Sequence, residues 1–245
     1  MNAAIITARV GSPESPDKNM YPVNGIPLIS YPIRIAREAK LIDEIFVSTD
    51  GPEIAAYCHA NGVKVIERPQ ELRGLDVNHG DVIRHAVEHV NATSIALENV
   101  AVLLGNSVML DGATLDKAFS ILDSQPDVDS CMTVWKAVND HPERAMGLVD
   151  GALTAYQGGN THVTTEHEAY PAAYYFDQGA WIFRKETVSE NSGPGPWWWM
   201  GKKCVPIVRP WIQGRDVHRY FDLLLAEWWV QNEEKIARIN SAEKS

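Results

Sequence analysis

Short apolar segments alternate with amphipathic segments along most of the chain, and this alternation limits the folds that the chain can adopt. Apolar runs predict strands over residues 3–8, 41–50, 63–69, 98–107, 130–138 and 204–210. Helical spacing of apolar residues predicts helices over residues 27–40, 52–62, 80–90, 113–124 and 221–239. Strands that alternate with helices form a mostly parallel sheet with helices on both faces. The sequence therefore predicts the α/β fold class.

A different pattern between about residues 139 and 180 indicates a small appendage. This segment is polar, aromatic and rich in glycine, which is typical of hairpins or of a flap. A chain of 245 residues is long enough to form one large α/β domain. We therefore predict a single domain over residues 1–245, with a flap at about 139–180 that serves as a lid or as a dimerisation lobe.

Polar residues gather where the predicted strands end. In open α/β sheets, ligands bind at the carboxyl ends of the strands. Four strand ends carry polar residues in this chain, at 9–19, 48–50, 68–69 and 105–107. We expect the binding site at this edge of the sheet.

The loop over residues 9–19 places two cations, Arg9 and Lys18, directly after the first strand. Backbone N–H groups and cations in such a loop can bind a phosphate group. The loop lacks the Gly-Lys-Ser/Thr of a P-loop and the G-x-G-x-x-G of a dinucleotide-binding fingerprint. Two interpretations stay open on the loop alone: a phosphate-binding loop, and a surface loop with incidental charges.

Composition limits the partners and the compartment. A net charge of −10 disfavours broad contact with nucleic acids or anionic membranes, so we expect neither as a partner. The chain contains no apolar run near the ~20 residues of a membrane span, and its start does not have the pattern of a signal peptide. Three widely spaced cysteines suit a reducing compartment. We expect a cytoplasmic protein.

The first strand and loop, "IITARVGSPESPDKN", resemble the signature of the cytidylyltransferases that activate sialic acid and related sugar acids. The matching residues are Arg9, Ser12, Pro16, Lys18 and Asn19. Further matches follow in the order of the family pattern: "NGIPLI", "IDEIFVSTDGPEIA", "GVKVIERPQEL", "AVLLGNS", "HPER", "FDQGAWIF" and "GRDVHRYFDLLLAE". The resemblance covers nearly the whole chain, and its strength lies in the order of the pieces.

The resemblance implies a Rossmann-like nucleotidyltransferase fold, a homodimer and a specific reaction. A CMP-sugar synthetase transfers CMP from CTP to a nonulosonic (sialic-acid-like) or related 3-deoxy sugar acid and releases pyrophosphate. The implied catalytic residues are Arg9, Lys18 and Asp216. The implied nucleotide-binding residues are Arg9, Gly11, Ser12, Lys18, Asn19, Arg68, Asn106 and Ser107.

The resemblance also implies a divalent cation, usually Mg²⁺, on an Asp-x-Asp pair near the C-terminus. Here the pair reads Asp216-Val217-His218, so the second Asp has become His. As a neutral ligand, His218 favours Mn²⁺ or Co²⁺ more than an all-oxygen site does. The sequence leaves two other roles open for His218, a general base and a solvated side chain. Asp216 could alternatively be a helix N-terminal acid.

The predicted sugar-binding residues are Arg144, Trp198 and Trp199. A cation at Arg144 suits a carboxylate, and Trp faces suit the apolar side of a sugar ring; the tryptophans could instead form a dimer contact. Two expected cations are missing, because Pro13 replaces a Lys, and Glu166 and Glu168 stand where the family carries an Arg.

These departures keep alternative functions open. One is a nucleotidyltransferase of the same fold that uses another nucleoside triphosphate or a sugar phosphate. A second is a relative that binds nucleotides without catalysis. A third interpretation rests on "HAVEH", since His85 and His89 of this H-x-x-E-H motif could hold zinc in a peptidase.

Overall fold

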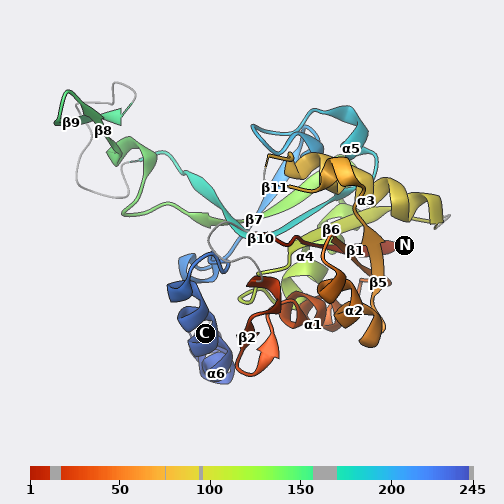
Figure 1. The fold of residues 1–245 in the computed structure, drawn as a ribbon. Helices are drawn as coiled ribbons and strands as arrows, with labels where there is room; N and C mark the ends of the chain where they lie inside the picture. Colours follow the sequence, from red (N-terminus) through yellow and green to blue (C-terminus); the bar gives the residue numbers. More distant parts are fainter. Residues whose placement is uncertain (12–17, 75, 94–95, 157–169, 243–245) are drawn as a thin grey trace.

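The computed structural model describes residues 1–245 except 12–17, 75, 94–95, 157–169 and 243–245. In the described part of the chain, a seven-stranded sheet forms the centre of the protein (Figure 1), in the order β11-β7-β10-β6-β1-β4-β5. The strands are β1 (Asn2–Ala8), β4 (Glu44–Thr49), β5 (Lys64–Glu67), β6 (Asn99–Leu104), β7 (Ser130–Lys136), β10 (Tyr174–Arg184) and β11 (Cys204–Val208). All neighbours pair in parallel except β10, which runs antiparallel to β6 and β7.

Helices cover both faces of this sheet, so the predicted α/β architecture is confirmed. One face packs against α1 (Ser30–Glu38), α2 (Pro52–Ala60) and α4 (Gly112–Ser124). The other face packs against α3 (His79–Thr93), α5 (Thr187–Glu190) and the 3-10 turn η6 (Trp198–Met200). Each predicted helix and strand is present, with ends that differ by a few residues.

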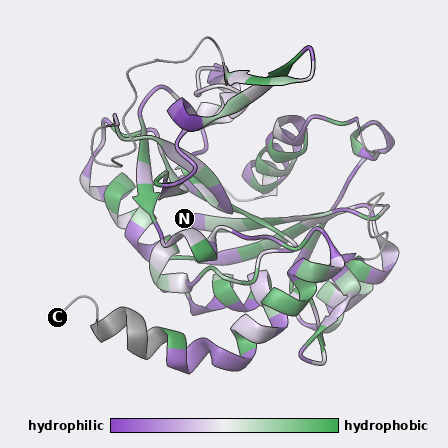
Figure 2. Ribbon diagram, turned by 90° about the vertical axis from the view of Figure 1, so that its left-hand side faces the viewer, coloured by the Kyte–Doolittle hydropathy of each residue, from purple (hydrophilic) through white to green (hydrophobic). Residues whose placement is uncertain are grey.

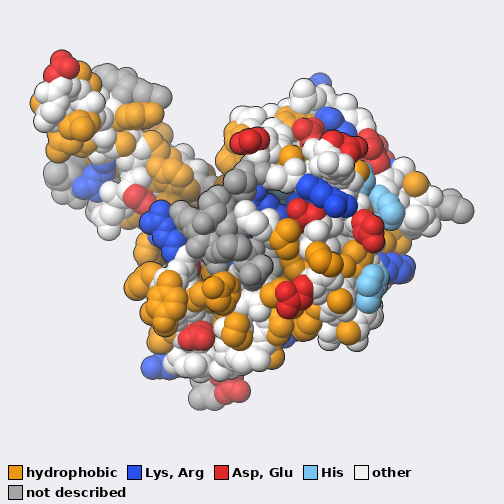
Figure 3. Space-filling view, in the orientation of Figure 1, with side chains coloured by type: hydrophobic (Ala, Val, Ile, Leu, Met, Phe, Trp, Pro, Cys, Tyr) orange, Lys and Arg blue, Asp and Glu red, His pale blue; other side chains and the backbone are white. Residues whose placement is uncertain are grey.

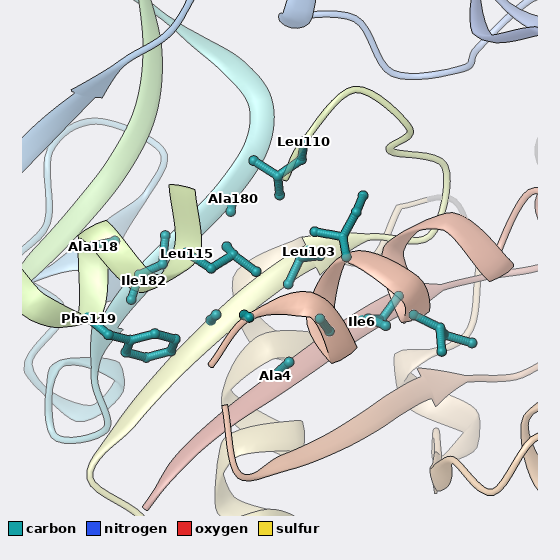
Figure 4. Packing of buried hydrophobic residues seen from close by; sticks show 14 of the residues in the cluster. Ala4, Ile6, Leu103, Leu110, Leu115, Ala118, Phe119, Ala180 and Ile182 are labelled. Atoms are coloured by element: carbon teal, nitrogen blue, oxygen red, sulfur yellow. The ribbon is translucent and has the colours of Figure 1, made fainter. Parts of the chain in front are cut away.

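The pleat of β1 explains why its sequence is apolar throughout. Ala4 and Ile6 point into the core beneath α1 and α4, where Figure 4 shows them with Leu103 and Phe119. The alternate residues Ala3 and Ile5 join the core beneath α3. Because a central parallel strand is buried on both faces, both sets of side chains must be apolar.

The last helix, α6 (Tyr220–Ala242), lies beside the sheet and closes a third apolar cluster. Val217 and Trp229 contribute to this cluster, together with Val23 from the small hairpin of β2 (Pro22–Val23) and β3 (Ile26–Pro27). In the described residues, no helix combines the length and the apolar character needed to cross a membrane.

A hairpin projects away from the sheet within the predicted flap. It contains the 3-10 turn η3 (Pro142–Arg144) and the paired strands β8 (Met146–Val149) and β9 (Ala152–Ala155). Hydrophobic residues extend onto this hairpin (Figure 2), and the space-filling view shows them exposed there (Figure 3). Strand β10 begins at Tyr174 and so overlaps the end of the predicted range of about 139–180.

Candidate active site

A cleft of roughly 370 Å³ opens at the carboxyl ends of β1 and β6, where the sequence predicts a binding site. Its walls combine cations, carboxylate, imidazole and apolar groups. The lining residues are Thr7, Arg9, Lys18, Asn19, Arg68, Leu72, Gly74, Val77, His79, Val82, Leu104, Asn106, Gln178, Asp216 and His218. In an acidic chain, this gathering of Arg and Lys side chains in one cleft favours an anionic ligand.

The loop after β1 contributes the cations Arg9 and Lys18. Asn19 fixes the two ends of this loop, because its Nδ2 donates to the Arg9 carbonyl oxygen at 2.8 Å. Arg9 Nη1 donates to the Gly74 carbonyl oxygen, 3.2 Å away, and Lys18 Nζ donates to the Val217 carbonyl oxygen at 3.3 Å. The two cations are therefore held against segments that are distant in sequence.

Arg68 and His79 form a second, more buried part of the wall. Arg68 is 5% exposed and donates through Nε to Ser48 Oγ at 3.1 Å. Burial lowers the pKa of Arg68 to about 10, although Asp50 opposes that shift. His79 Nε2 lies 3.0 Å from Thr7 Oγ1. Burial lowers the pKa of His79 to about 4, and Arg68 and Arg9 add to this effect, so the imidazole is neutral at pH 7.

Asp216 is the centre of a third group in the cleft. Its Oδ2 accepts hydrogen bonds from Asn106 Nδ2 at 2.9 Å and from His218 Nε2 at 2.8 Å. Asp216 is 8% exposed, whereas the His218 side chain is 58% exposed. The hydrogen bond that His218 donates to Asp216 raises the pKa of His218, and burial opposes this shift. An antiparallel bridge between Ser107 and Asp216 joins this group to the end of β6.

The structure brings together most of the residues that the sequence predicts for the site. Seven of them line the cleft: Arg9, Lys18, Asn19, Arg68, Asn106, Asp216 and His218. Ser107 lies next to it, and its hydroxyl donates to the Gln178 carbonyl oxygen at 2.9 Å. Gly11 has a φ of +74°, a left-handed conformation that suits glycine. Ser12, Pro13, Pro16, Glu166 and Glu168 lie outside the described residues.

The three predicted sugar-binding residues lie elsewhere in the described structure. Arg144 is part of η3 on the projecting hairpin. Trp199 is 3% exposed and belongs to the core beneath α3. Trp198 packs over Gly80, with the Arg84 guanidinium 4.1 Å from its ring centroid. None of the three is among the described lining residues of the cleft of this chain.

Sequence reasoning missed Thr7, His79 and Gln178 as lining residues. Thr7 is part of an apolar strand, and its one sign of function is its position at the carboxyl end of that strand. His79 begins α3, and Gln178 lies in the segment predicted as the flap, whereas the structure places it in β10.

The H-x-x-E-H motif is not a metal centre in the described structure. The rings of His85 and His89 lie 6.5 Å apart between centroids. No group of three or more His, Cys, Asp or Glu side chains among the described residues could hold a metal ion. The zinc peptidase interpretation therefore has no support.

The model of the cytidylyltransferase family matches residues 3–190. The chain belongs to this family. The match covers β1 and the loop of Arg9 and Lys18 through to β10. It therefore includes most of the cleft and ends before Asp216 and His218.

Curated relatives support the same assignment. A pseudaminic acid cytidylyltransferase from Campylobacter jejuni is 30% identical over 184 residues, which cover 74% of this chain and 77% of the relative. A 3-deoxy-manno-octulosonate cytidylyltransferase from Bdellovibrio bacteriovorus is 30% identical over 125 residues, which cover 51% of this chain and 47% of the relative. For three of the curated relatives, including the Bdellovibrio protein, the match covers less than half of the relative's own length: 47, 29 and 19%.

The fold is shared with a solved structure of a CMP-sugar-acid synthetase. The structure of CMP:2-keto-3-deoxy-manno-octonic acid synthetase complexed with CTP aligns with a TM-score of 0.68 and 16% sequence identity. The alignment covers 95% of this chain and 99% of that chain. The predicted Rossmann-like nucleotidyltransferase fold is thus confirmed for this chain.

Proposed function

We propose that this cytidylyltransferase transfers CMP from CTP to a nonulosonic (sialic-acid-like) or related 3-deoxy sugar acid and releases pyrophosphate. One observation carries the proposal: a single cleft combines the cations Arg9 and Lys18 with the Asp216 group. The first set suits a triphosphate, and the second suits the reacting end of an acceptor. Family membership and the relatives that act on such sugar acids support this assignment.

In the proposed reaction, a hydroxyl oxygen of the sugar acid attacks the α-phosphorus of CTP. A new P–O bond forms, and the hydroxyl proton passes to the solvent. The bond between the α-phosphorus and the oxygen that bridges it to the β-phosphorus breaks, and pyrophosphate leaves with the electron pair of that bond as added negative charge. Arg9 and Lys18 bind the phosphates and stabilise that charge, because preorganised cations act where charge develops. Asn19 holds their loop in place through the Arg9 carbonyl oxygen.

The nucleoside would lie along the more buried wall of the cleft. Leu72, Val77 and Val82 offer apolar contacts there, and Arg68 and the neutral His79 offer polar ones. Asn106 Nδ2 donates both to Asp216 and to the Val217 carbonyl oxygen. Since both of its protons are used in this way, Asn106 serves the Asp216 group more than it reads a base edge.

The residues of the Asp216 group fit a divalent cation, which we propose to be Mg²⁺, with Mn²⁺ as a second candidate. Mg²⁺ is commonly bound by one or two carboxylates together with substrate phosphates, so Asp216 and the triphosphate supply a suitable set of oxygens. His218 would add an imidazole, which Mn²⁺ accepts more readily. When bound, such an ion polarises the phosphates.

We also propose a homodimer that is built through the projecting hairpin. Leu148 and Leu153 face each other across β8 and β9 and are 73% and 70% exposed. A two-stranded hairpin is only marginally stable alone, and large exposed apolar side chains on it favour an interface. Arg144 lies in the same segment, so its predicted contact with a sugar would be made in the cleft of the other subunit.

The free thiols of Cys58, Cys131 and Cys204 agree with the expected cytoplasmic location.

Pyrophosphate release tests the proposed function directly. The assay combines CTP, GTP, UTP or ATP with a panel of α-keto sugar acids and sugar phosphates, in the presence of Mg²⁺. Release with CTP and a sugar acid supports the proposal. Release with another nucleotide or with a sugar phosphate overturns the assignment of substrates while keeping the reaction class. Nucleotide binding without any release favours a non-catalytic relative.

A further inference from the structure

Strand β10 loses its regular pairing beside the cleft. Its register with β7 shifts between Phe176 and Trp181, and within this break Gln178 has a φ of +59°. A residue other than glycine adopts this left-handed conformation at a cost in free energy, so its surroundings must hold it there. The exposed side chain of Gln178 lines the cleft. A strained residue thus stands at the mouth of the proposed active site.

A buried ion pair lies directly beneath this turn. Arg209 Nε lies 2.6 Å from Asp177 Oδ2, and the two side chains are 4% and 0% exposed. Arg209 also donates to the Met109 and Gln213 carbonyl oxygens, at 3.0 and 3.2 Å. The guanidinium therefore joins four segments of the chain: β10, β11, the segment after β6 and the 3-10 turn η7 (Trp211–Gln213).

The turn is fixed on either side of Gln178. Before it, Asp177 Oδ1 accepts a hydrogen bond from the Gly179 amide at 2.9 Å. After it, a Cβ at Gly179 would lie 2.6 Å from Thr133 Oγ1 and 2.7 Å from Arg209 Nη2, so no larger residue fits. The Gln178 carbonyl oxygen accepts from Ser107 Oγ at 2.9 Å. Because Ser107 pairs with Asp216, the contacts continue into the Asp216 group.

We propose that Arg209 and Asp177 are positioning residues, whose buried ion pair holds the Gln178 turn so that the Gln178 carboxamide faces the acceptor substrate. The inference rests on the proposed function, because it assigns this side of the cleft to a sugar acid. A carboxamide presents two donors and one acceptor oxygen without a charge, which suits hydroxyl and carboxylate groups. Buried ion pairs often add little net stability. Since this one lies under a strained turn at a cleft, we assign it the role of holding that turn.

The double variant D177N/R209M tests the proposal. It removes both charges, so that no unpaired charge remains buried, and the new carboxamide at position 177 keeps an oxygen for the Gly179 amide. We expect the KM for the acceptor to rise about tenfold or more, with kcat and the KM for CTP within about twofold of wild type. The matched control is R184M. Arg184 ends β10 on the side away from the cleft and likewise donates to backbone carbonyl oxygens, those of Val128 and Leu122.

Equal increases in both KM values, or an unchanged KM for the acceptor, would overturn the positioning role. If the double variant does not fold, R209K takes its place with the same expected split, because lysine keeps the charge but lacks the guanidinium fork. Hydrogen exchange supplies a readout that needs no turnover. The Gly179 amide should exchange at least about tenfold faster in D177N/R209M than in wild type or R184M. Unchanged exchange contradicts the inference, whereas a wild-type protein without turnover contradicts only the proposed function.

Discussion

Asn106 Nδ2 lies 2.9 Å from Asp216 Oδ2, although 110 residues separate the two side chains in the sequence. The same amide nitrogen donates to the Val217 carbonyl oxygen at 2.7 Å, and the Val217 amide donates back to the Asn106 carbonyl oxygen at 3.1 Å. The segment that carries Asp216 is thereby fastened to the end of β6. This contact brings the carboxylate into the same cleft as the cations of the first loop.

Asp216→Asn should reduce kcat for pyrophosphate release by about 100-fold or more, because the variant loses the carboxylate that we propose to hold the divalent cation. The side chain keeps its size, and the CTP affinity should change less than kcat. Steady-state kinetics over a range of Mg²⁺ concentrations measures the effect.

Asp111→Asn provides the matched control for that substitution. Asp111 is the N-cap of α4 and accepts from the Thr114 amide at 2.7 Å. Because asparagine is also a good N-cap, D111N should retain full turnover. If D216N turns over as fast as D111N, the role of Asp216 is structural, like that of Asp111.

Arg9→Met should raise the KM for CTP by about 10- to 100-fold, since a hydrogen bond to a charged group is worth roughly 1.5–3 kcal/mol. The KM for the acceptor should stay close to the wild-type value. Arg37→Met is the control, because Arg37 donates to the Asn61 carbonyl oxygen on the surface, away from the cleft. An unchanged KM for CTP in R9M would show that the loop does not bind the triphosphate.

His218→Asp restores the Asp-x-Asp pattern that the resemblance implies. If His218 is a ligand of the metal, the variant should keep turnover and shift its preference from Mn²⁺ toward Mg²⁺, because an all-oxygen site favours the harder ion. Turnover measured with each ion separately gives the ratio. Loss of turnover with both ions would favour the role of general base, and an unchanged ratio would favour a solvated side chain.

The layout of the sheet was predictable because its strands are buried on both faces. Ile5 and Ile6 point into opposite cores, so the sequence of β1 has to be continuously apolar, and that pattern is readable without a structure. Strand β10 was not predicted, because the pattern of its first residues indicates the flap. Its antiparallel direction was not readable either, since an apolar run such as Ala180–Phe183 is the same for either direction. Direction depends on the long connection from β7, which contains the flap.

The residues of the site also fall into a group that the sequence predicts and a group that it does not. Arg9, Arg68 and Asn106 follow strands directly, and the rule for strand ends places them in the cleft. The role of Gln178 depends on the ion pair of Asp177 with Arg209, which lies 32 residues further along the chain. No local pattern reveals such a contact, because it forms only when β10 and β11 pack on β7.

His79 should make the stability of the protein depend on pH. Its pKa is about 4 in the folded protein and about 6.5 in an unfolded chain. As the pH falls below 6.5, the unfolded state therefore binds a proton that the folded state excludes. The contribution to stability is complete above pH 6.5 and is lost progressively toward pH 4, with a loss of about 2 to 3 kcal/mol by pH 4.5.

Urea denaturation at pH 7.5, 6.5, 5.5 and 4.5 measures this effect when wild type is compared with His79→Gln. The variant lacks the titrating group, so its free energy of unfolding should fall less steeply with decreasing pH. The difference in slope should average about 1 kcal/mol per pH unit between 6.5 and 4.5. His59→Gln, at an exposed position on α2, should retain the wild-type slope. Equal slopes for wild type and H79Q would exclude a His79 that stays neutral in the folded protein.

Leu148→Asp should convert the proposed dimer into a monomer. Leu148 lies opposite Leu153 on the hairpin, and a carboxylate there would have to be desolvated at an apolar interface, which costs several kcal/mol. Sedimentation should give twice the chain mass of 27.2 kDa for wild type and a single chain for L148D. Ile26→Asp changes an exposed apolar residue of β3 outside the flap, and this variant should remain dimeric.

If Arg144 binds the sugar across the dimer, L148D should also raise the KM for the acceptor while the KM for CTP stays constant. A wild-type monomer with full turnover would refute both the dimer and the shared site.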